Sequence, residues 1–182
     1  MGEGGPILNC QDSLTPNLLV FIYSGLLVAS YRRFAFSNLS YGLFTVFLSL
    51  HLVGAHYTYE HTPPGLWLQV LFDIERNHYD RIVHFAFGLL IAYPFREILQ
   101  RAAGVRPAWS YFLAVSCILA FSAFYELLEA AVAAVVSPEL GAAYLGTQGD
   151  SWDAQKDAFL AFSGALLAMA LSWSWTRSRS NR

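Results

Sequence analysis

Residues 109–136 read WSYFLAVSCILAFSAFYELLEAAVAAVV, an apolar run in which Glu126 and Glu129 are the only charged residues. About 20 apolar residues are enough to carry an α-helix across the roughly 30 Å of hydrocarbon in a bilayer. This run therefore predicts a membrane-spanning helix. Its two acids need a partner, because a charge at the centre of a bilayer costs about 2.5 to 3.5 kcal/mol on insertion scales.

The rest of the chain has the same apolar character. Its composition is 55% hydrophobic and only 13% charged, whereas about a quarter of the residues in soluble domains are charged. The apolar runs predict five spans, at about 17–33, 38–59, 79–97, 108–136 and 153–175, after a polar N-terminal tail at 1–16. We expect one all-α domain over 1–182, a polytopic membrane helix bundle with about five transmembrane helices.

Several classes of protein are excluded by what the sequence lacks. Cys10 and Cys117 are too few for a disulfide framework, and neither has a CxxC partner. The tail has no Lys or Arg and no apolar core, so we expect no cleavable signal peptide. The chain carries no GxSxG or HExxH motif and no phosphate-binding loop.

Arginine placement predicts how the bundle is oriented. If the spans alternate in direction, one side carries the connections after the first and third spans and the C-terminal tail. This side then holds eight of the eleven basic residues: Arg32, Arg33, Arg96, Arg101, Arg106, Arg177, Arg179 and Arg182. The positive-inside bias puts it in the cytoplasm. We therefore expect an N-terminus outside and a cytoplasmic C-terminus in a bacterial inner membrane.

The two longest connections fall on the outer side, at 60–79 and 137–152. The first contains PPG at 63–65 and the second GTQG at 146–149, and both predict tight turns. Asp150 follows the second turn and is expected to cap the last helix.

Ionisable residues gather in the outer half of four spans. His51, His84, Glu126 and Asp157 lie on four different helices at a similar depth, judged from the helical rise of about 1.5 Å per residue. Imidazole and carboxylate groups together bind zinc, iron or manganese. The sequence therefore predicts a divalent transition metal held by these four residues.

Further acids lie within one helical turn of these predicted ligands. Asp80, Glu129 and Asp153 are three or four residues from His84, Glu126 and Asp157, and so lie on the same helix faces. We expect them to orient ligands or to act as the catalytic base.

Arg76 and Arg81 are two of the three basic residues on the outer side. A guanidinium group pairs well with a phosphate or carboxylate, so one interpretation is that they bind the anionic head group of a substrate. The other is that Arg81 pairs with Asp80 or Glu75 in its own loop.

Two other interpretations of the polar residues stay open. They form a hydrogen-bonded network that holds the helices together without metal, or they line a proton or ion path. The network would comprise Asp80, Arg81, His84, Glu126, Lys156 and Asp157.

Four motifs carry a resemblance to a known family. HLVGAHYTYE at 51–60, RNHYDRIVHF at 76–85, YELLE at 125–129 and LGTQGDSWDAQKD at 145–157 resemble the signature of the YjdF family. These are bacterial inner-membrane proteins of unknown function. The resemblance covers about 32–175 and implies a polytopic fold and an inner-membrane location, but no reaction. More distantly, Asp80, His84, Glu126 and the acidic start of the last helix resemble VanZ-like membrane proteins, which are linked to glycopeptide tolerance.

Together these features favour a metal-dependent membrane enzyme, a hydrolase or an oxygenase, that acts on a lipid or a lipid-linked group at the outer leaflet. The alternative is a non-enzyme: an ion or solute carrier, or a subunit of a membrane assembly. Membrane lipid is the expected partner and nucleic acid is not. The sequence leaves the oligomeric state open.

Overall fold

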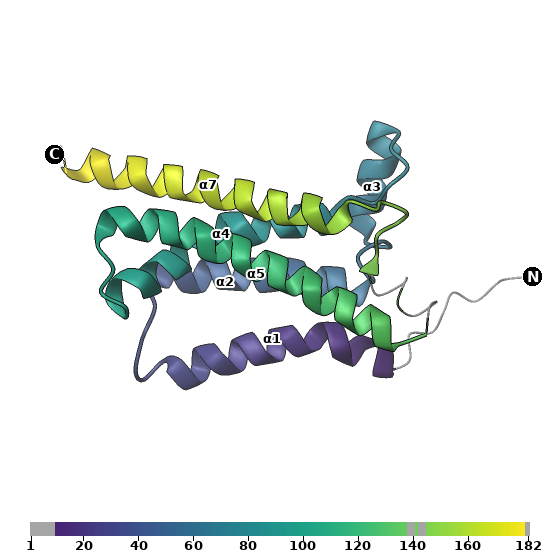
Figure 1. Cartoon of the computed structure of the whole chain (residues 1–182), viewed down its shortest axis with the longest axis horizontal. Coiled ribbons are helices and arrows are strands. Elements are labelled where there is room, and N and C mark those ends of the chain that lie inside the picture. Colours follow the sequence, from purple (N-terminus) through teal and green to yellow (C-terminus); the bar gives the residue numbers. More distant parts are fainter. Residues whose placement is uncertain (1–9, 138–140, 142–144, 181–182) are drawn as a thin grey trace, which may run out of the picture.

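The computed structural model describes residues 10–137, 141 and 145–180, and all the regular structure in this part of the chain is helical (Figure 1). Its helices are α1 (Cys10–Ser30), α2 (Asn38–His56), α3 (Pro63–Phe72), α4 (Tyr79–Arg101), α5 (Pro107–Val135) and α7 (Asp153–Ser180). The all-α prediction is confirmed.

Within the described residues, four helices are long and apolar enough to cross a membrane: α2, α4, α5 and α7. They match the last four predicted spans to within a few residues at most ends. In α1, the apolar stretch among the residues with described side chains is Val20–Ser30. This helix begins at Cys10, seven residues before the predicted start of the first span. Residues 1–9 of the predicted tail lie outside the described residues.

Helix α4 lies at the centre of the bundle. It packs against α7, α5 and α2, and α7 also packs against α5. Helix α1 packs on α2, at the edge of the bundle (Figure 1). This position agrees with the sequence. The first predicted span is the one that contains no Asp, Glu or His, so no such side chain requires it to face the interior of the bundle.

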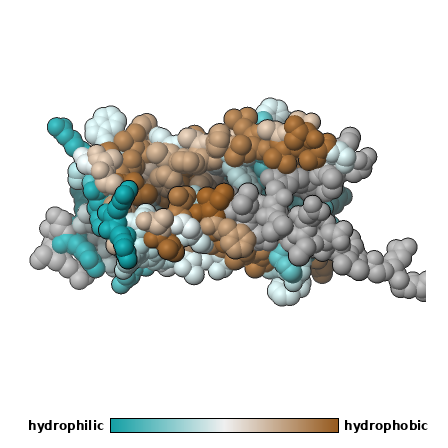
Figure 2. Space-filling view, turned by 90° about the horizontal axis from the view of Figure 1, so that it is seen from below, coloured by the Kyte–Doolittle hydropathy of each residue, from teal (hydrophilic) through white to brown (hydrophobic). Residues whose placement is uncertain are grey.

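The core between these helices is built from large side chains on α2 and small ones on α7. Phe44 and Phe47 of α2 are buried, as are Ala161 and Ala165 of α7. Large apolar side chains also cover the outside of the bundle, which Figure 2 shows as brown surface along its length. A surface of this kind fits lipid as its solvent.

Glycines set the distance between α4 and α7. A methyl group added to Gly88 of α4 would overlap the backbone carbonyl of Ala161 on α7. A methyl group added to Gly164 of α7 would overlap the carbonyl of Phe85 on α4. The two backbones can approach this closely only because both positions lack a Cβ, as is common where membrane helices cross tightly.

The described basic residues of the predicted cytoplasmic side share one end of the bundle, here called the arginine-rich end. It contains the α1–α2 connection, the α4–α5 connection and the end of α7 (Figure 1). Glu97 of α4 is the acid at this end. Its carboxylate accepts hydrogen bonds from the Ser37 backbone at 2.8 Å, from Ser40 Oγ at 2.5 Å and from Arg101. These bonds tie the start of α2 to α4. Arg182 lies outside the described residues.

One prediction about the opposite end is wrong. The PPG sequence at 63–65 does not make a tight turn but begins the ten-residue helix α3. Proline is favoured in the first turn of a helix, where its missing N–H would have no partner and its φ is already suitable. The predicted turn at 146–149 is confirmed, with the Asp150 N–H donating to the Thr147 carbonyl at 2.9 Å.

The close crossing of α4 and α7 predicts a specific sensitivity to added volume. Gly88→Ala should lower the stability of the detergent-solubilised protein by about 1–3 kcal/mol, because backbone atoms cannot move aside as side chains can. Gly42→Ala is the matched control, since nothing lies within 4 Å of a Cβ at this position on α2. Its effect should be neutral or stabilising. Thermal unfolding followed by circular dichroism gives both values, and equal midpoints would contradict the crossing.

Candidate metal centre

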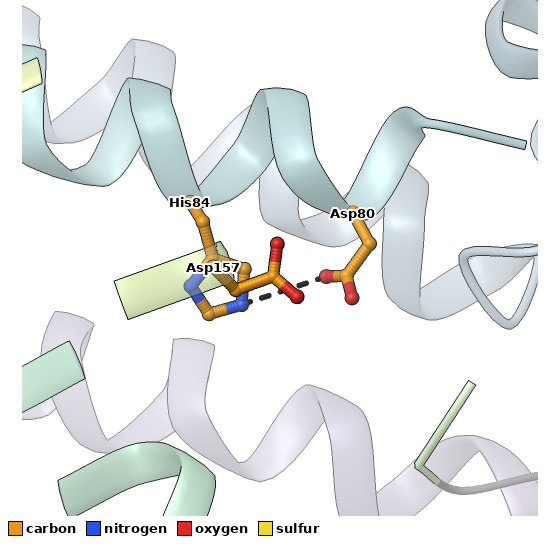
Figure 3. Close-up of side chains that lie close together, drawn as sticks. All are labelled: Asp80, His84 and Asp157. Atoms are coloured by element: carbon orange, nitrogen blue, oxygen red, sulfur yellow. Dashed lines mark ion pairs between the residues drawn. The ribbon is translucent and has the colours of Figure 1, made fainter. Parts of the chain in front are cut away.

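Three side chains from α4 and α7 converge at the end of the bundle opposite the arginine-rich end. Asp80 and His84 lie one turn apart on α4, and Asp157 lies on the first turns of α7. Each offers a ligand atom, and these atoms all lie within 4.8 Å of one another. Figure 3 shows the two carboxylates and the imidazole turned toward one another. The arrangement is compact enough to surround one metal ion.

Helix α5 adds a fourth ligand candidate and orients the imidazole. The Nε2 atom of His84 lies 3.3 Å from Glu126 Oε1 and 3.6 Å from Asp80 Oδ1. On the other side of the ring, Nδ1 lies 3.5 Å from the hydroxyl oxygen of Ser122. A ring nitrogen held in this way fixes the histidine tautomer, so that the opposite nitrogen faces the metal. We call Asp80, His84, Glu126 and Asp157 the acid–imidazole cluster.

Burial distinguishes this cluster from a chance group of surface acids. Asp157 is only 1% exposed, and its Oδ1 atom has no hydrogen-bond partner among the described residues. Glu126 Oε1 is likewise buried and makes no hydrogen bond in this part of the chain. Buried polar atoms are almost always hydrogen-bonded. A bound cation would satisfy these two carboxylate oxygens, which belong to residues of the same cluster.

The structure does not bring His51, the remaining predicted ligand, into this cluster. His51 is buried on α2, where its Nδ1 lies 2.5 Å from the hydroxyl of Tyr59. Thr58 and Tyr59 both adopt left-handed backbone angles, so the chain folds back over α2. Gly54 leaves room for the Tyr59 ring, because a Cβ there would overlap it. The helical rise predicts how deep His51 lies along α2, but it does not predict the direction of its side chain.

Asp80, Glu129 and Asp153, which the sequence predicts to orient ligands or to act as the base, have different surroundings. Glu129 lies one turn beyond Glu126 on α5 and hydrogen-bonds Tyr125. Asp80 is part of the cluster itself. Asp153, by contrast, lies 2.6 Å from the Arg76 guanidinium and 3.5 Å from that of Arg81. Asp153 is therefore engaged by two arginines.

Arg76 and Arg81 pair with acids just before and at the start of α7. Arg81 binds the Asp150 carboxylate, and Arg76 binds Asp153 and donates to the Thr147 carbonyl. Lys156 adds a contact to Asp150 at 2.6 Å. One of the two interpretations of Arg81 was a pairing with Asp80 or Glu75 in its own loop; its partners are instead Asp150 and Asp153. We call Arg76, Arg81, Asp150 and Asp153 the arginine clasp.

Neighbouring groups shift the pKa values of two residues at the clasp that lie outside the spans. The Lys156 ammonium and the Trp152 backbone N–H hold the pKa of Asp150 below its ordinary value. The stabilisation from a carboxylate of this kind is present above the unfolded pKa of about 3.9 and is lost as the pH falls further. The clasp is therefore intact near neutral pH. Burial, then Arg81 and Arg76, lower the pKa of His78, so this imidazole is neutral at pH 7.

Asn77 is the central residue that the sequence did not indicate. It is 1% exposed. Its side-chain nitrogen donates to the carbonyls of Glu60 and Thr62 at 2.9 and 3.2 Å, and its side-chain oxygen accepts from the Tyr79 N–H at 3.0 Å. The Gln148 side chain pairs with the Asn77 backbone at 3.0 and 3.1 Å. Asn77 therefore joins the two connections next to the clasp.

A cavity of about 370 Å³ lies beside the cluster. Glu126 and Asp153 form part of its wall, together with Thr147 and the apolar residues Ala130 and Leu145. No Lys, Arg or His is among the described residues that line it. The cavity gives a ligand direct access to one member of the cluster.

Comparisons with known proteins agree with this architecture. A family described as "Predicted membrane protein (DUF2238)" matches residues 9–178. The chain belongs to this family. It is also 41% identical, over 148 residues, to the inner membrane protein YjdF of Escherichia coli strain K12, a match that covers 81% of this chain and 70% of that protein.

These matches confirm the resemblance to the YjdF family that the four motifs indicate. With several helices able to span a membrane, the chain is a multi-pass protein of the inner membrane. Neither description names a reaction. No solved structure matches the chain.

The position of Asn77 predicts a strong effect of its removal. Asn77→Ala should lower stability by about 1–3 kcal/mol, because it leaves buried backbone groups without partners. Asn38→Ala is the control, since Asn38 is exposed at the start of α2. Thermal unfolding in detergent compares the two variants. If both unfold at the wild-type temperature, the two connections are not held together through Asn77.

Proposed function

We propose that this protein is a membrane enzyme that uses a divalent transition metal, bound by the acid–imidazole cluster, to act on a lipid or lipid-linked group. The observation that carries the proposal is the cluster geometry: Asp80, His84 and Asp157 offer ligand atoms within 4.8 Å of one another. The unsatisfied oxygens of Asp157 and Glu126 support it.

The ligand set narrows the choice of metal. The sequence suggested two imidazoles, but with His51 bound to Tyr59 the cluster holds one imidazole and carboxylates from Asp80, Glu126 and Asp157. Carboxylate-rich sites suit manganese, and sites that include an imidazole also suit iron and zinc. Catalytic zinc usually has two or three histidine or cysteine ligands. We therefore favour manganese or iron over zinc, and a single histidine argues against the oxygenase site built from two histidines and one carboxylate.

Hydrolysis is the reaction that this set supports best. A metal in the cluster would lower the pKa of bound water and polarise a phosphoryl or carbonyl oxygen. Glu129, one turn from Glu126, is the candidate base for the proton of that water. Asp153 was another candidate, but we assign it to the arginine clasp because it contacts two guanidinium groups.

The surroundings of the cavity support a substrate that comes from the bilayer. On α5, Leu127 and Leu128 follow Glu126 directly and are exposed on the apolar surface. A lipid-linked substrate could keep its tail there while its polar group enters the cavity. Because Arg76 and Arg81 are held in the clasp, we assign them to holding Asp150 and Asp153, which line the cavity, rather than to binding an anionic head group.

The apolar core below the cluster makes an ion or solute carrier less suitable as the function. Between His84 and Glu97, the buried residues of α4 are Ala86, Gly88, Ile91, Ala92 and Pro94. Here the backbones of α4 and α7 are also in close contact at Gly88 and Gly164. A carrier needs polar groups or water near the middle of the bilayer. The polar groups of the cluster instead stay at one end.

We also propose that the cluster faces the periplasm, because the positive-inside bias places the arginine-rich end in the cytoplasm. Alkaline phosphatase fused to the C-terminus should then be inactive. In a background without Cys10 and Cys117, Glu75→Cys should react with a membrane-impermeant maleimide in intact cells. An active fusion with an unlabelled cysteine would reverse the orientation.

Metal analysis tests the central part of the proposal. Protein purified identically from wild type, His84→Ala and Asp157→Asn should show about one metal ion per wild-type chain and a loss of metal in both variants. Asp157→Asn is the sharper change, because it keeps the side-chain shape and removes the charge that binds the cation.

Two histidine controls make this test specific. His51→Ala should keep its metal, because His51 contacts Tyr59 rather than the cluster. His56→Ala should also keep it, because His56 is exposed at the end of α2. Circular dichroism checks that every variant remains helical. If wild type holds no more metal than His84→Ala, the cluster is a structural network and the proposed enzyme loses its basis.

A further inference from the structure

Helix α3 exposes an unusually apolar surface. Its sequence is PPGLWLQVLF, which contains no charged residue. Trp67 is 71% exposed and Val70 is 86% exposed, and Leu66, Leu71 and Phe72 are exposed as well. Nothing in the described part of the chain covers these side chains. A surface of this kind is costly in water, so it indicates contact with an apolar environment.

The position of α3 indicates which environment this is. Figure 1 shows α3 at the end of the bundle away from the arginine-rich end, where it runs across the direction of the spans and extends to the side beyond α7. Ten residues of helix are roughly 15 Å long, about half of what a hydrocarbon core requires. A short helix at this level, lying across the spans, is placed along the surface of the membrane.

The orientation of α3 is fixed by contacts at both of its ends. Near its start, Gly65 packs so closely against Asn77 that a Cβ would overlap the amide group. Near its end, Gln69 Nε2 donates to the Glu75 carbonyl at 2.7 Å, and Asp73 takes a left-handed backbone angle that ends the helix. The apolar surface of α3 is therefore held in one direction relative to the bundle.

We infer that α3 is an interfacial helix whose exposed apolar side chains are seated in the leaflet at the cluster end of the bundle. The occupant of this surface is lipid of the same membrane. Lipid already covers the sides of the bundle, so the surface on α3 extends an interface that the spans require. A tryptophan on this helix fits the same location, because tryptophan is enriched where hydrocarbon meets water. Helices of this type bind by burying their apolar face at the boundary between head groups and acyl chains.

This placement also links the membrane to the candidate metal centre. Asn77 contacts α3 through Gly65, and its backbone pairs with Gln148 of the other connection. Next to Asn77 in the chain, Arg76 binds Asp153. Holding α3 in the leaflet therefore also holds the connection between α3 and α4, which carries Arg76 of the clasp.

Spin labelling of the protein in lipid vesicles tests the inference. In a background with Cys10→Ser and Cys117→Ser, a nitroxide is attached to Val70→Cys, and the protein is placed in vesicles of phosphatidylethanolamine and phosphatidylglycerol. Collision rates with oxygen, which concentrates in hydrocarbon, and with a water-soluble nickel chelate are then measured. Two matched positions calibrate the result: Glu75→Cys, exposed after α3, and Val46→Cys, exposed in the middle of α2.

The inference predicts a ratio of oxygen to nickel collisions at Val70 that is several-fold higher than at Glu75 and lower than at Val46. A ratio equal to that at Glu75 would place α3 in water and overturn the inference. Low collision rates with both reagents would mean that protein covers the helix. Strong spin–spin broadening would identify that protein as a second copy of this chain. The result does not depend on whether the cluster binds metal.

Discussion

The close approach of α4 and α7 is the contact on which the rest of the structure depends. Gly88 and Gly164 let the two backbones touch, and they lie one to two turns below the residues of the candidate site. His84 precedes Gly88 by one turn on α4, and Asp157 precedes Gly164 by about two turns on α7. Only helices that cross this closely can bring Asp157 to within ligand distance of His84 and Asp80.

The distribution of polar groups follows from the cost of placing charge in lipid. Nearly all of the charged residues lie at the ends of the bundle. At each end, their ion pairs and hydrogen bonds hold a connection against a helix or against another connection. Glu97 binds serines of the α1–α2 connection at one end, and the arginine clasp joins two long connections at the other. Between them the core is apolar and tightly packed. In the acid–imidazole cluster, Glu126 and Asp157 each keep a buried carboxylate oxygen without a hydrogen-bond partner among the described residues, and a cation would satisfy both.

The sequence predicts most of the helices, because a membrane span depends on the residues of one continuous segment. Apolar length predicted α2, α4, α5 and α7, and helical spacing put Asp80 and His84 on one face. The spacing of nearby residues does not predict which side chains pair across the fold. Arg81 meets Asp150, which is 69 residues away, and not a nearby acid. The direction of the His51 side chain depends on the left-handed residues Thr58 and Tyr59 after α2, and the sequence HLVGAHYTYE at 51–60 does not reveal those backbone angles. Helix α3 was missed because two prolines and a glycine usually indicate a turn.

The claim that one histidine and several carboxylates hold a metal can be tested directly by X-ray absorption spectroscopy on the purified protein. The absorption edge identifies the metal, and the fine structure reports its ligands. The account predicts manganese or iron surrounded by light atoms, with the scattering pattern of a single imidazole. A spectrum with several imidazoles or with sulfur ligands, or protein with no metal edge above background, would contradict it.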